Sequence, residues 1–408
     1  MPHTVDQPAS RPLVVVALAT ALCLAGDSML YIALPVYWRD VGLDALWQVG
    51  VLLSVNRLIR LPFNPMIGWL YQRISLRTGL LLATAIGATT TLGYGIAQGF
   101  IAWLVLRAAW GVGWSFFRIG GLSAVVYCSN GQSRGQAMGL YNGLYRLGSL
   151  AGMLLGGLLV PLYGLPALAL SFTAMALLGL PLLLRYFHLP AGYGAQQIAP
   201  AKSTITAHGA GPATGVHAVL INGFSVALLI QGVLAATLSA LIAHFYGNEL
   251  DLFGLLLGAT ALSGFLQALR WSWEPWLGKR VGAWSDRPGG RSRLYGWTLA
   301  GAAASFGLMA SGLPLAAWIA VTVVVMLLAT ALTTLSDALA SDVASTGNVV
   351  AFMTRYSIAQ DLGAALGPLF AYLLIGLNNG FAWLYWGGSL IYLLLALAWL
   401  RPARPTHG

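Results

Sequence analysis

The residues of this sequence with the clearest chemical capacity are charged side chains inside long apolar segments. Asp27 stands in LCLAGDSMLYIALP, and Arg107 stands in LVLRAAWGVGWS. A charge in hydrocarbon is costly unless it finds a partner or lines a polar cavity. A lone carboxylate in such a place can carry a proton, and a fixed ion pair with Arg107 is the alternative. Because a pair that alternates between bridged and protonated states satisfies both interpretations, we predict that Asp27 and Arg107 couple protons.

Four further arginines fall inside apolar segments of the first half of the chain. Arg57 and Arg60 stand in SVNRLIRLPFNPMIG, where their spacing places them on one face of a helix, and Arg118 and Arg146 follow in later segments. Arginine makes bidentate contacts with carboxylates and phosphates. The excess of arginines over acids therefore favours an anionic or zwitterionic small molecule over a simple cation. We predict that these four residues bind or gate that molecule.

Acidic residues take complementary places in the second half, where Glu274, Asp337 and Asp361 stand in apolar segments. Glu274 lies 214 residues after Arg60 (274 − 60), and Asp361 lies 215 residues after Arg146 (361 − 146). Bridges within these two pairs could close a cavity and open when substrate or protons compete. Fixed salt bridges are the alternative, which we favour for Glu274 because it stands close to a helix end. For Asp361 we favour the cavity.

Aromatic residues in the same segments could line an amphipathic pocket beside the charges. The ones that we assign to substrate binding or gating are Tyr31, Trp114 and Tyr145. Ordinary packing or a place at the lipid interface is the alternative for each of them.

The elements that must position these residues are membrane-spanning helices. Of the 408 residues 58% are hydrophobic and 8% are charged, and the mean hydropathy of +0.77 excludes a water-soluble globule. A helix of about 20 apolar residues crosses about 30 Å of hydrocarbon. Twelve such segments fall near residues 12–37, 46–71, 79–98, 101–127, 136–160, 165–186, 215–245, 252–278, 292–311, 315–341, 350–375 and 380–400. The prediction is an all-α integral membrane protein with six helices in each of two pseudo-symmetric bundles.

The loops predict the orientation and the domain organisation. With both termini in the cytoplasm, Arg39 alone lies outside, and thirteen loop cations lie inside: Arg11, Arg73, Arg77, Arg134, Arg185, Lys202, Lys279, Arg280, Arg287, Arg291, Arg293, Arg401 and Arg404. These cations can face the anionic headgroups of the inner leaflet, which explains the net charge of +10 without a nucleic-acid partner. We expect bundles at residues 1–187 and 214–408, joined by a cytoplasmic linker at 188–213 that is rich in Pro, Gly, Ala and Gln.

A series of glycines four residues apart, which we call a glycine ladder, occurs once in each half of the sequence. Gly148 and Gly152 of the first half match Gly363 and Gly367 of the second, since 363 − 148 and 367 − 152 are both 215. Glycines four residues apart share a helix face and let two helix backbones touch. The helix-packing glycines that we predict in the fifth segment are Gly139, Gly148, Gly152 and Gly156. A duplicated membrane chain with a ladder in each half is typical of transporters.

The loops after the second and eighth segments carry a family resemblance. GAWSDRPGGRSR matches the pattern Gly-x-x-x-Asp-Arg-x-Gly-Arg at Gly282, Asp286 and Arg287. The first-half copy, GWLYQRISLRTG, keeps Gly68, Arg73 and Arg77 but has Gln72 in place of the acid. Over nearly its whole length the sequence resembles transporters of the major facilitator superfamily. In that family the charged residues of this loop hold helices together on the cytoplasmic side. Because Gln72 carries no charge, we do not expect the usual ion pair in the first half.

Two further matches indicate one subgroup of this family. Arg107, Gly111 and Gly113 resemble the Arg-x-x-x-Gly-x-Gly element of the family, whose arginine is implicated in proton coupling. The ladder of the fifth segment resembles the motif of proton-coupled drug and metabolite exporters, except that Met153 replaces its proline. The resemblance thus implies a twelve-helix fold that works by alternating access, and it favours export over import.

We therefore predict a secondary transporter in a bacterial inner membrane that exports a small anionic, zwitterionic or amphipathic organic compound in exchange for protons. Proton-coupled uptake of an organic anion is the first alternative, and a non-transporting partner or sensor in a membrane complex is the second. No Walker loop, nucleophile elbow, CxxC or HExxH occurs in the sequence, so we expect no enzyme activity, cofactor or metal. We expect a monomer whose partners are its substrate, protons and membrane lipid.

Overall fold

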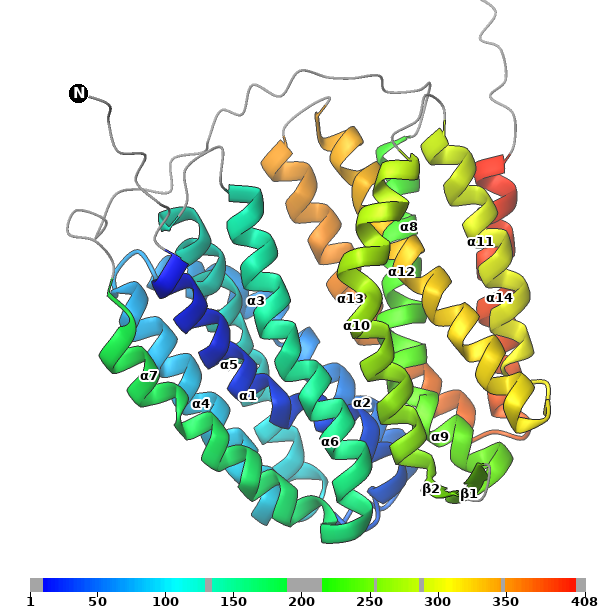
Figure 1. Ribbon diagram of the computed structural model, residues 1–408, viewed down its shortest axis with the longest axis horizontal. Helices are drawn as coiled ribbons and strands as arrows, with labels where there is room; N and C mark the ends of the chain where they lie inside the picture. Colours follow the sequence, from blue (N-terminus) through cyan, green and yellow to red (C-terminus); the bar gives the residue numbers. More distant parts are fainter. Residues whose placement is uncertain are drawn as a thin grey trace, which may run out of the picture. The chain divides into compact units, whose positions relative to one another are not determined.

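The computed structural model describes residues 10–128, 134–188, 215–252, 255–285, 290–345 and 349–400 (Figure 1). Nearly all of these residues are helical. The α-helices are α1 (Ser10–Tyr37), α2 (Leu46–Leu58), α3 (Arg60–Leu70), α4 (Leu76–Ile96), α5 (Phe100–Tyr127), α6 (Arg134–Leu177), α7 (Gly179–Tyr186), α8 (Val216–Val226), α9 (Ala235–Tyr246), α10 (Ala259–Ser285), α11 (Gly290–Leu308), α12 (Leu315–Ser345), α13 (Val349–Ile375) and α14 (Gly380–Leu400). The other elements are the π-helix η1 (Ala227–Leu234) and the strands β1 (Glu249–Leu252) and β2 (Leu255–Gly258). The predicted linker lies outside the described residues apart from His188.

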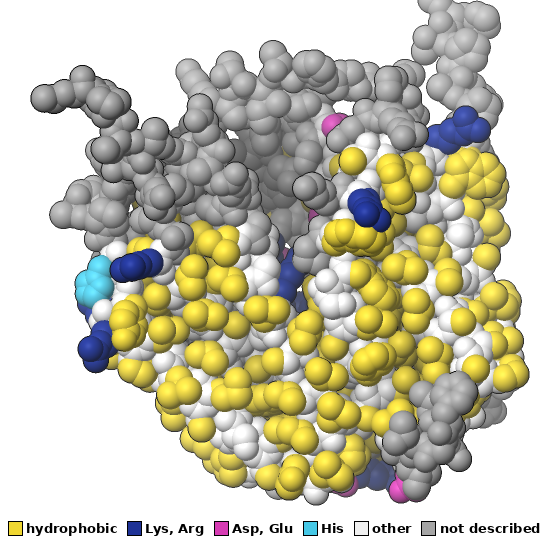
Figure 2. All heavy atoms as spheres, viewed as in Figure 1, with side chains coloured by type: hydrophobic (Ala, Val, Ile, Leu, Met, Phe, Trp, Pro, Cys, Tyr) yellow, Lys and Arg dark blue, Asp and Glu magenta, His cyan; other side chains and the backbone are white. Residues whose placement is uncertain are grey.

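The predicted membrane spans coincide with these helices. Eight stretches of the described residues are long and apolar enough to cross a membrane, and one of them, Leu140–Tyr186, covers the fifth and sixth predicted spans. The second, eighth and ninth spans coincide with α2 and α3, with α10 and with α11, which are interrupted or more polar. Hydrophobic side chains cover most of the described surface in view (Figure 2). The all-α membrane fold with twelve spanning segments is therefore confirmed.

Proline and glycine mark the interruptions within the helices. In α6 the backbone leaves helical geometry at Gly164, with φ of 79°, two residues before Pro166. This point separates the predicted fifth and sixth spans. A positive φ of that kind strains any residue with a side chain, so glycine is required at the turn.

A small β-hairpin precedes α10 and departs from the predicted spans. β1 pairs with β2 in antiparallel register, with Glu249 opposite Gly258 and Leu252 opposite Leu255. The eighth span was predicted to begin at residue 252, whereas α10 begins at Ala259. The apolar run LFGLLLG is continuous with the helix, so hydropathy alone could not separate strand from helix.

The chain divides into two compact units. Unit 1 comprises the described parts of Met1–Gln48, Val55–Ile198 and Asn248–Ala268, and unit 2 comprises those of Val49–Ser54, Ala199–Gly247 and Leu269–Gly408. In unit 1, the start of α10 contacts α6, where Thr260 donates a hydrogen bond of 3.2 Å to the Gly157 carbonyl. The predicted bundles, 1–187 and 214–408, stay a prediction of the domain organisation.

The core of unit 1 surrounds α1, which packs against α4, α5, α6 and α7. Buried side chains from these helices form one apolar cluster, which includes Val16, Cys23, Ala83, Trp110 and Phe117. Since α1 contributes buried residues along its whole length, it holds Asp27 inside the protein rather than at a lipid-facing surface.

Candidate functional site

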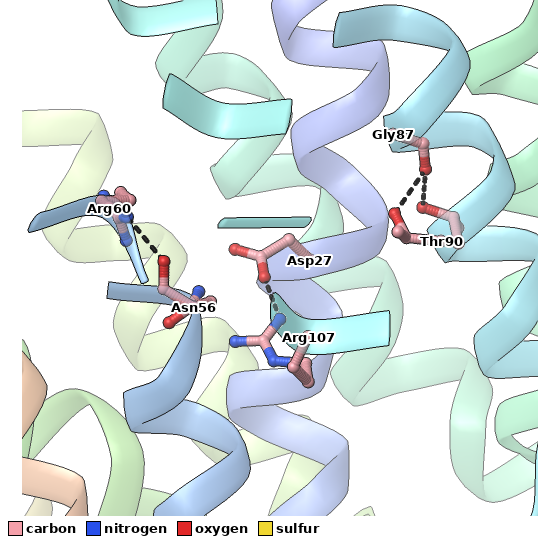
Figure 3. Close-up of polar contacts among 7 residues, drawn as sticks. Asp27, Asn56, Arg60, Gly87, Thr90 and Arg107 are labelled. Atoms are coloured by element: carbon pink, nitrogen blue, oxygen red, sulfur yellow. Dashed lines mark hydrogen bonds and ion pairs between the residues drawn. The ribbon is translucent and has the colours of Figure 1, made fainter. Parts of the chain in front are cut away.

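Asp27 and Arg107 form an ion pair in the interior of unit 1 (Figure 3). Arg107 Nη1 of α5 donates to Asp27 Oδ1 of α1. Arg107 is fully buried and Asp27 is 7% exposed. The structure therefore brings together the two residues that the sequence assigned to proton coupling, while the coupling itself stays a prediction.

Close packing of α1 against α4 holds the ion pair in place. Gly26, next to Asp27, faces Thr91 of α4 so closely that a Cβ atom would overlap its side chain. Thr90 and Thr91 both donate hydrogen bonds to the Gly87 carbonyl, at 3.0 and 2.8 Å (Figure 3). The hydroxyl groups are thus satisfied within α4, and α1 can approach α4 without exposing polar groups to hydrocarbon.

Aromatic rings surround the charges of the pair. The guanidinium carbons of Arg57 and Arg107 each lie 5.9 Å from the ring centroid of Tyr31. Tyr94 of α4 interacts electrostatically with the pair and stacks on Trp103, with ring centroids 5.1 Å apart. The face of an aromatic ring is negative and attracts cations. Tyr31 therefore lies beside the ion pair, while its role in substrate binding stays a prediction, and Tyr94 is a neighbour that the sequence did not reveal.

The second predicted span is divided between two helices that meet at Ile59. α2 ends at Leu58 and α3 begins at Arg60, but Ile59 keeps right-handed helical geometry, with φ of −62° and ψ of −26°, and donates a backbone hydrogen bond of 2.9 Å to the Val55 carbonyl. The chain therefore stays helical through this α2–α3 junction, although Pro62 cannot donate the backbone hydrogen bond of its own turn. At the junction, Arg60 Nε donates a hydrogen bond of 2.8 Å to the Asn56 carbonyl (Figure 3).

Gly111 of α5 allows the α2–α3 junction to pack closely against α5. A Cβ atom at Gly111 would overlap the Asn56 carbonyl oxygen and the side chain of Ile59. The family-like spacing of Arg107 and Gly111 therefore has a physical role here, since one turn of α5 holds the buried arginine and the next receives the α2–α3 junction.

A row of aromatic rings continues from Arg60. Its guanidinium carbon lies 6.0 Å from the Trp114 ring centroid. Trp114 contacts Trp110 at 6.2 Å and Tyr145 at 5.9 Å between centroids, and Tyr145 contacts Tyr141 at 5.1 Å. The predicted residues Trp114 and Tyr145 are thus neighbours, and they place apolar surface beside a cation.

The other predicted gating residues lie in separate helices. Arg118 of α5 and Arg146 of α6 are half-buried in unit 1, and Glu274 of α10 and Asp361 of α13 are half-buried in unit 2. Half-buried charges within membrane spans are typical of polar cavities. The two proposed pairings, of Arg60 with Glu274 and of Arg146 with Asp361, join different units and stay predictions.

The glycine ladders bring α6 and α13 against the first helix of their own units. Cβ atoms at Gly148 and Gly152 would overlap the carbonyl oxygens of Ala21 and Ala25, and one at Gly156 would lie 3.0 Å from Met29. Gly139 lies in the first turns of α6. These contacts leave no room for a side chain on that face of α6.

The second ladder makes the matching contacts in unit 2. Gly363 faces the Phe224 carbonyl, and Gly367 faces Leu228 and Gly232. The contacted residues repeat at a constant offset, since 224 − 21, 228 − 25 and 232 − 29 are all 203. The duplication seen in the sequence is thus a duplication of helix contacts.

The loop motifs hold helix ends in each unit. Arg77 donates to the Leu184 carbonyl at the end of α7, and Arg291 forms an ion pair with Asp342 near the end of α12. These arginines are equivalent by sequence, because 291 − 77 is 214. Of these two contacts, the one in the second copy is with a carboxylate, and the one in the first copy is with a backbone carbonyl. Gly68 and Gly282 lie on α3 and α10, and Asp286 and Arg287 lie outside the described residues.

A polar network in unit 2 was missed by the site prediction. Tyr356 and Gln360 of α13 donate hydrogen bonds of 2.9 and 3.1 Å to Asp337 Oδ1 of α12. Ser336 lies 2.9 Å from the Tyr356 hydroxyl. The four-residue spacing places Tyr356 and Gln360 on one face of α13, but the sequence gave no signal that this face contacts Asp337 of α12.

The only two cysteines of the chain, Cys23 and Cys128, are both buried. Burial raises the pKa of the Cys128 thiol, which follows the last turn of α5, to about 11. Because the thiolate is the reactive form, we expect slow alkylation of Cys128 by iodoacetamide at about pH 7.5 and faster alkylation as the pH rises. Mass spectrometry of the labelled protein measures the rate, and denatured protein is the control. Equal rates in folded and denatured protein would contradict the burial of this thiol.

Comparisons with known proteins agree with this architecture. The sequence pattern of the Major Facilitator Superfamily matches residues 16–283 and 280–408. An uncharacterized MFS-type transporter, YcaD, of Salmonella newport (strain SL254) is 26% identical over 146 residues, and its counterpart in Salmonella typhimurium (strain LT2) gives the same values. These alignments cover 36% of this chain and 38% of the length of the relatives.

Solved structures share the fold over nearly the whole chain. A bacterial homolog of the human lysosomal transporter Spinster, in an inward-facing and occupied conformation, has a TM-score of 0.71 at 14% identity and covers 97% of each chain. The human organic anion transporter MFSD10 (TETRAN) has a TM-score of 0.62 at 19% identity and covers 96% of this chain and all of its own. From the family pattern and this shared fold, the chain belongs to the Major Facilitator Superfamily and is an integral membrane transporter rather than an enzyme.

Proposed function

We propose that this transporter carries a small organic anion across the membrane together with a proton that binds Asp27. The observation that carries the proposal is the ion pair of Asp27 with Arg107, beside the α2–α3 junction that bears Arg57 and Arg60. Transport follows by alternating access, as expected for this family, in a monomer with both termini in the cytoplasm.

The charge balance of the first half supports an anion as cargo. Away from the span ends, its membrane segments contain five arginines and a single acid, Asp27. Arg57 and Arg60 lie on either side of the α2–α3 junction, and their guanidinium groups can bind a carboxylate or phosphate through two hydrogen bonds. The aromatic row that begins at Trp114 offers apolar surface to an organic group.

The ion pair supports transport of the proton and the anion in the same direction. Asp27 is an internal anion that occupies Arg107. Protonation removes the negative charge of Asp27, and Arg107 can then attract another anion. Proton binding and anion binding therefore favour each other, and by linkage each raises the affinity of the site for the other. Such mutual support leads to transport of both in the same direction.

Export in exchange for protons is the second candidate, and the glycine ladder favours it. The contacts of Gly148 and Gly152 with α1 belong to a motif that resembles those of proton-coupled exporters. Exchange requires that proton and substrate compete, so that acid weakens substrate binding. The two candidates therefore predict opposite pH dependences, whereas a partner or sensor without transport activity predicts no flux of any substrate.

Binding measurements on the purified protein test the proposal. A panel of small carboxylates, sulfonates and phosphate esters is screened for thermal stabilisation, and affinities of those that bind are measured across the pH range. We expect tighter anion binding at lower pH, and we expect Arg57→Gln or Arg60→Gln to weaken binding about tenfold or more. Arg185→Gln is the control, because Arg185 is exposed at the end of α7 and should leave affinity unchanged. Stabilisation by organic cations alone would contradict an anionic cargo, and weaker anion binding at low pH would select exchange.

A further inference from the structure

The last turns of α10 expose an unusual stripe of side chains. Ser272, Trp276, Arg280 and Trp284 are all exposed and follow one another at intervals of four residues, so they lie on one face of the helix. Trp276 is 58% exposed and Trp284 is 53% exposed. We call the residues Trp276, Arg280 and Trp284 the α10 stripe.

The arginine of the α10 stripe is held in a defined position. Its guanidinium carbon lies 3.6 Å from the Trp276 ring centroid, a close cation–π contact. Within the described part of the chain, no carboxylate lies at salt-bridge distance from Arg280. A guanidinium group over a ring can still donate hydrogen bonds from its edge to a ligand outside the helix.

The same arrangement occurs at the end of α3 in unit 1. The Arg73 guanidinium carbon lies 3.9 Å from the ring centroid of Trp69, which stands four residues earlier and is 49% exposed. Both helix ends lead into the loops that the sequence assigns to the basic side of the membrane. Tryptophan is favoured at the level of the lipid headgroups, because its ring is apolar and its N–H is polar.

We propose that the α10 stripe binds the headgroup of an anionic phospholipid. The lipid phosphate pairs with Arg280, and the two tryptophan rings lie against the glycerol and the first carbons of the acyl chains. Exposed tryptophans on both sides of the arginine favour a lipid over a free phosphate ion, since only the lipid buries the rings as well as binding the charge. The site is separate from Asp27 and does not depend on the proposed transport function.

Lipid titration tests this site on the whole protein. The purified transporter is titrated in detergent with phosphatidylglycerol or phosphatidylcholine, and bound lipid is counted by native mass spectrometry. We expect preferential retention of phosphatidylglycerol, reduced about fivefold by Arg280→Gln and largely kept by Arg280→Lys. Trp276→Leu should also lower retention. Trp383→Leu is the matched control, because Trp383 is 68% exposed on α14 and none of the arginines in the described ranges stacks on its ring.

Two results would overturn the proposal. Unchanged phosphatidylglycerol retention in the double variant Trp276→Leu, Arg280→Gln would show that the α10 stripe does not bind the lipid. Displacement of the lipid by soluble glycerol phosphate at similar concentration would show that the site recognises phosphate alone. Preserved thermal stability of the variants in detergent separates lost binding from lost folding.

Discussion

Replacing Arg107 by Met should lower the free energy of unfolding by about 3–5 kcal/mol, because Asp27 would be left as an uncompensated charge in the protein interior. Both side chains are nearly inaccessible to solvent, at 0% for Arg107 and 9% for Asp27. Thermal denaturation of the detergent-solubilised protein measures the loss.

The double variant Asp27→Leu, Arg107→Met separates folding from function. It removes both charges at once, and replacing a buried ion pair by apolar groups of similar size is often neutral for stability. We expect stability close to that of the parent and no proton-coupled transport. A single variant Arg107→Met that melts like the parent would contradict the buried ion pair.

Replacing Gly148 by Leu should destabilise unit 1 by about 3 kcal/mol, at the upper end of the usual cost of overpacking. The new side chain would overlap the Ala21 carbonyl, which belongs to the backbone of α1 and cannot rotate away. Gly367→Leu should have the same effect in unit 2, where the ladder faces Leu228 and Gly232. Fluorescence-detected size exclusion and thermal denaturation report the loss of folded protein.

Gly143→Leu is the matched control on the same helix. No heavy atom lies within 4 Å of a Cβ atom at Gly143, and leucine favours helix more than glycine does. We therefore expect Gly143→Leu to be neutral or slightly stabilising. Equal damage from Gly143→Leu and Gly148→Leu would mean that helix flexibility, rather than the contact with α1, requires the ladder glycines.

Hydropathy and charge patterns predicted most of the fold. Twenty apolar residues can form only a helix in hydrocarbon, where each backbone group must be satisfied within its own segment, so the positions of the spans followed from composition. The boundary at Gly164 could also be predicted, because Gly164 and Pro166 interrupt an apolar run. The β-hairpin was missed because its apolar residues continue into α10 without a change in composition.

The sites were predicted less completely, because long-range contacts leave little trace in a single sequence. Asp27 and Arg107 were found because charges in apolar segments are rare. The α2–α3 junction at Ile59 had a signal in Pro62, because proline removes a backbone hydrogen bond from a helix. The partners of Arg291 and Asp337 could not be predicted, since each contact joins helices whose packing is set by the whole unit.

Proton movement driven by the anion in proteoliposomes tests the central claim most directly. An anion that the protein binds is added outside vesicles that contain the parent protein. The external medium should then become more alkaline, because protons enter with the anion. Asp27→Asn should abolish this change and make anion binding independent of pH, with folding verified by thermal denaturation. Anion-driven proton entry that persists in Asp27→Asn would contradict the role of Asp27, and acidification by the parent protein would contradict co-transport.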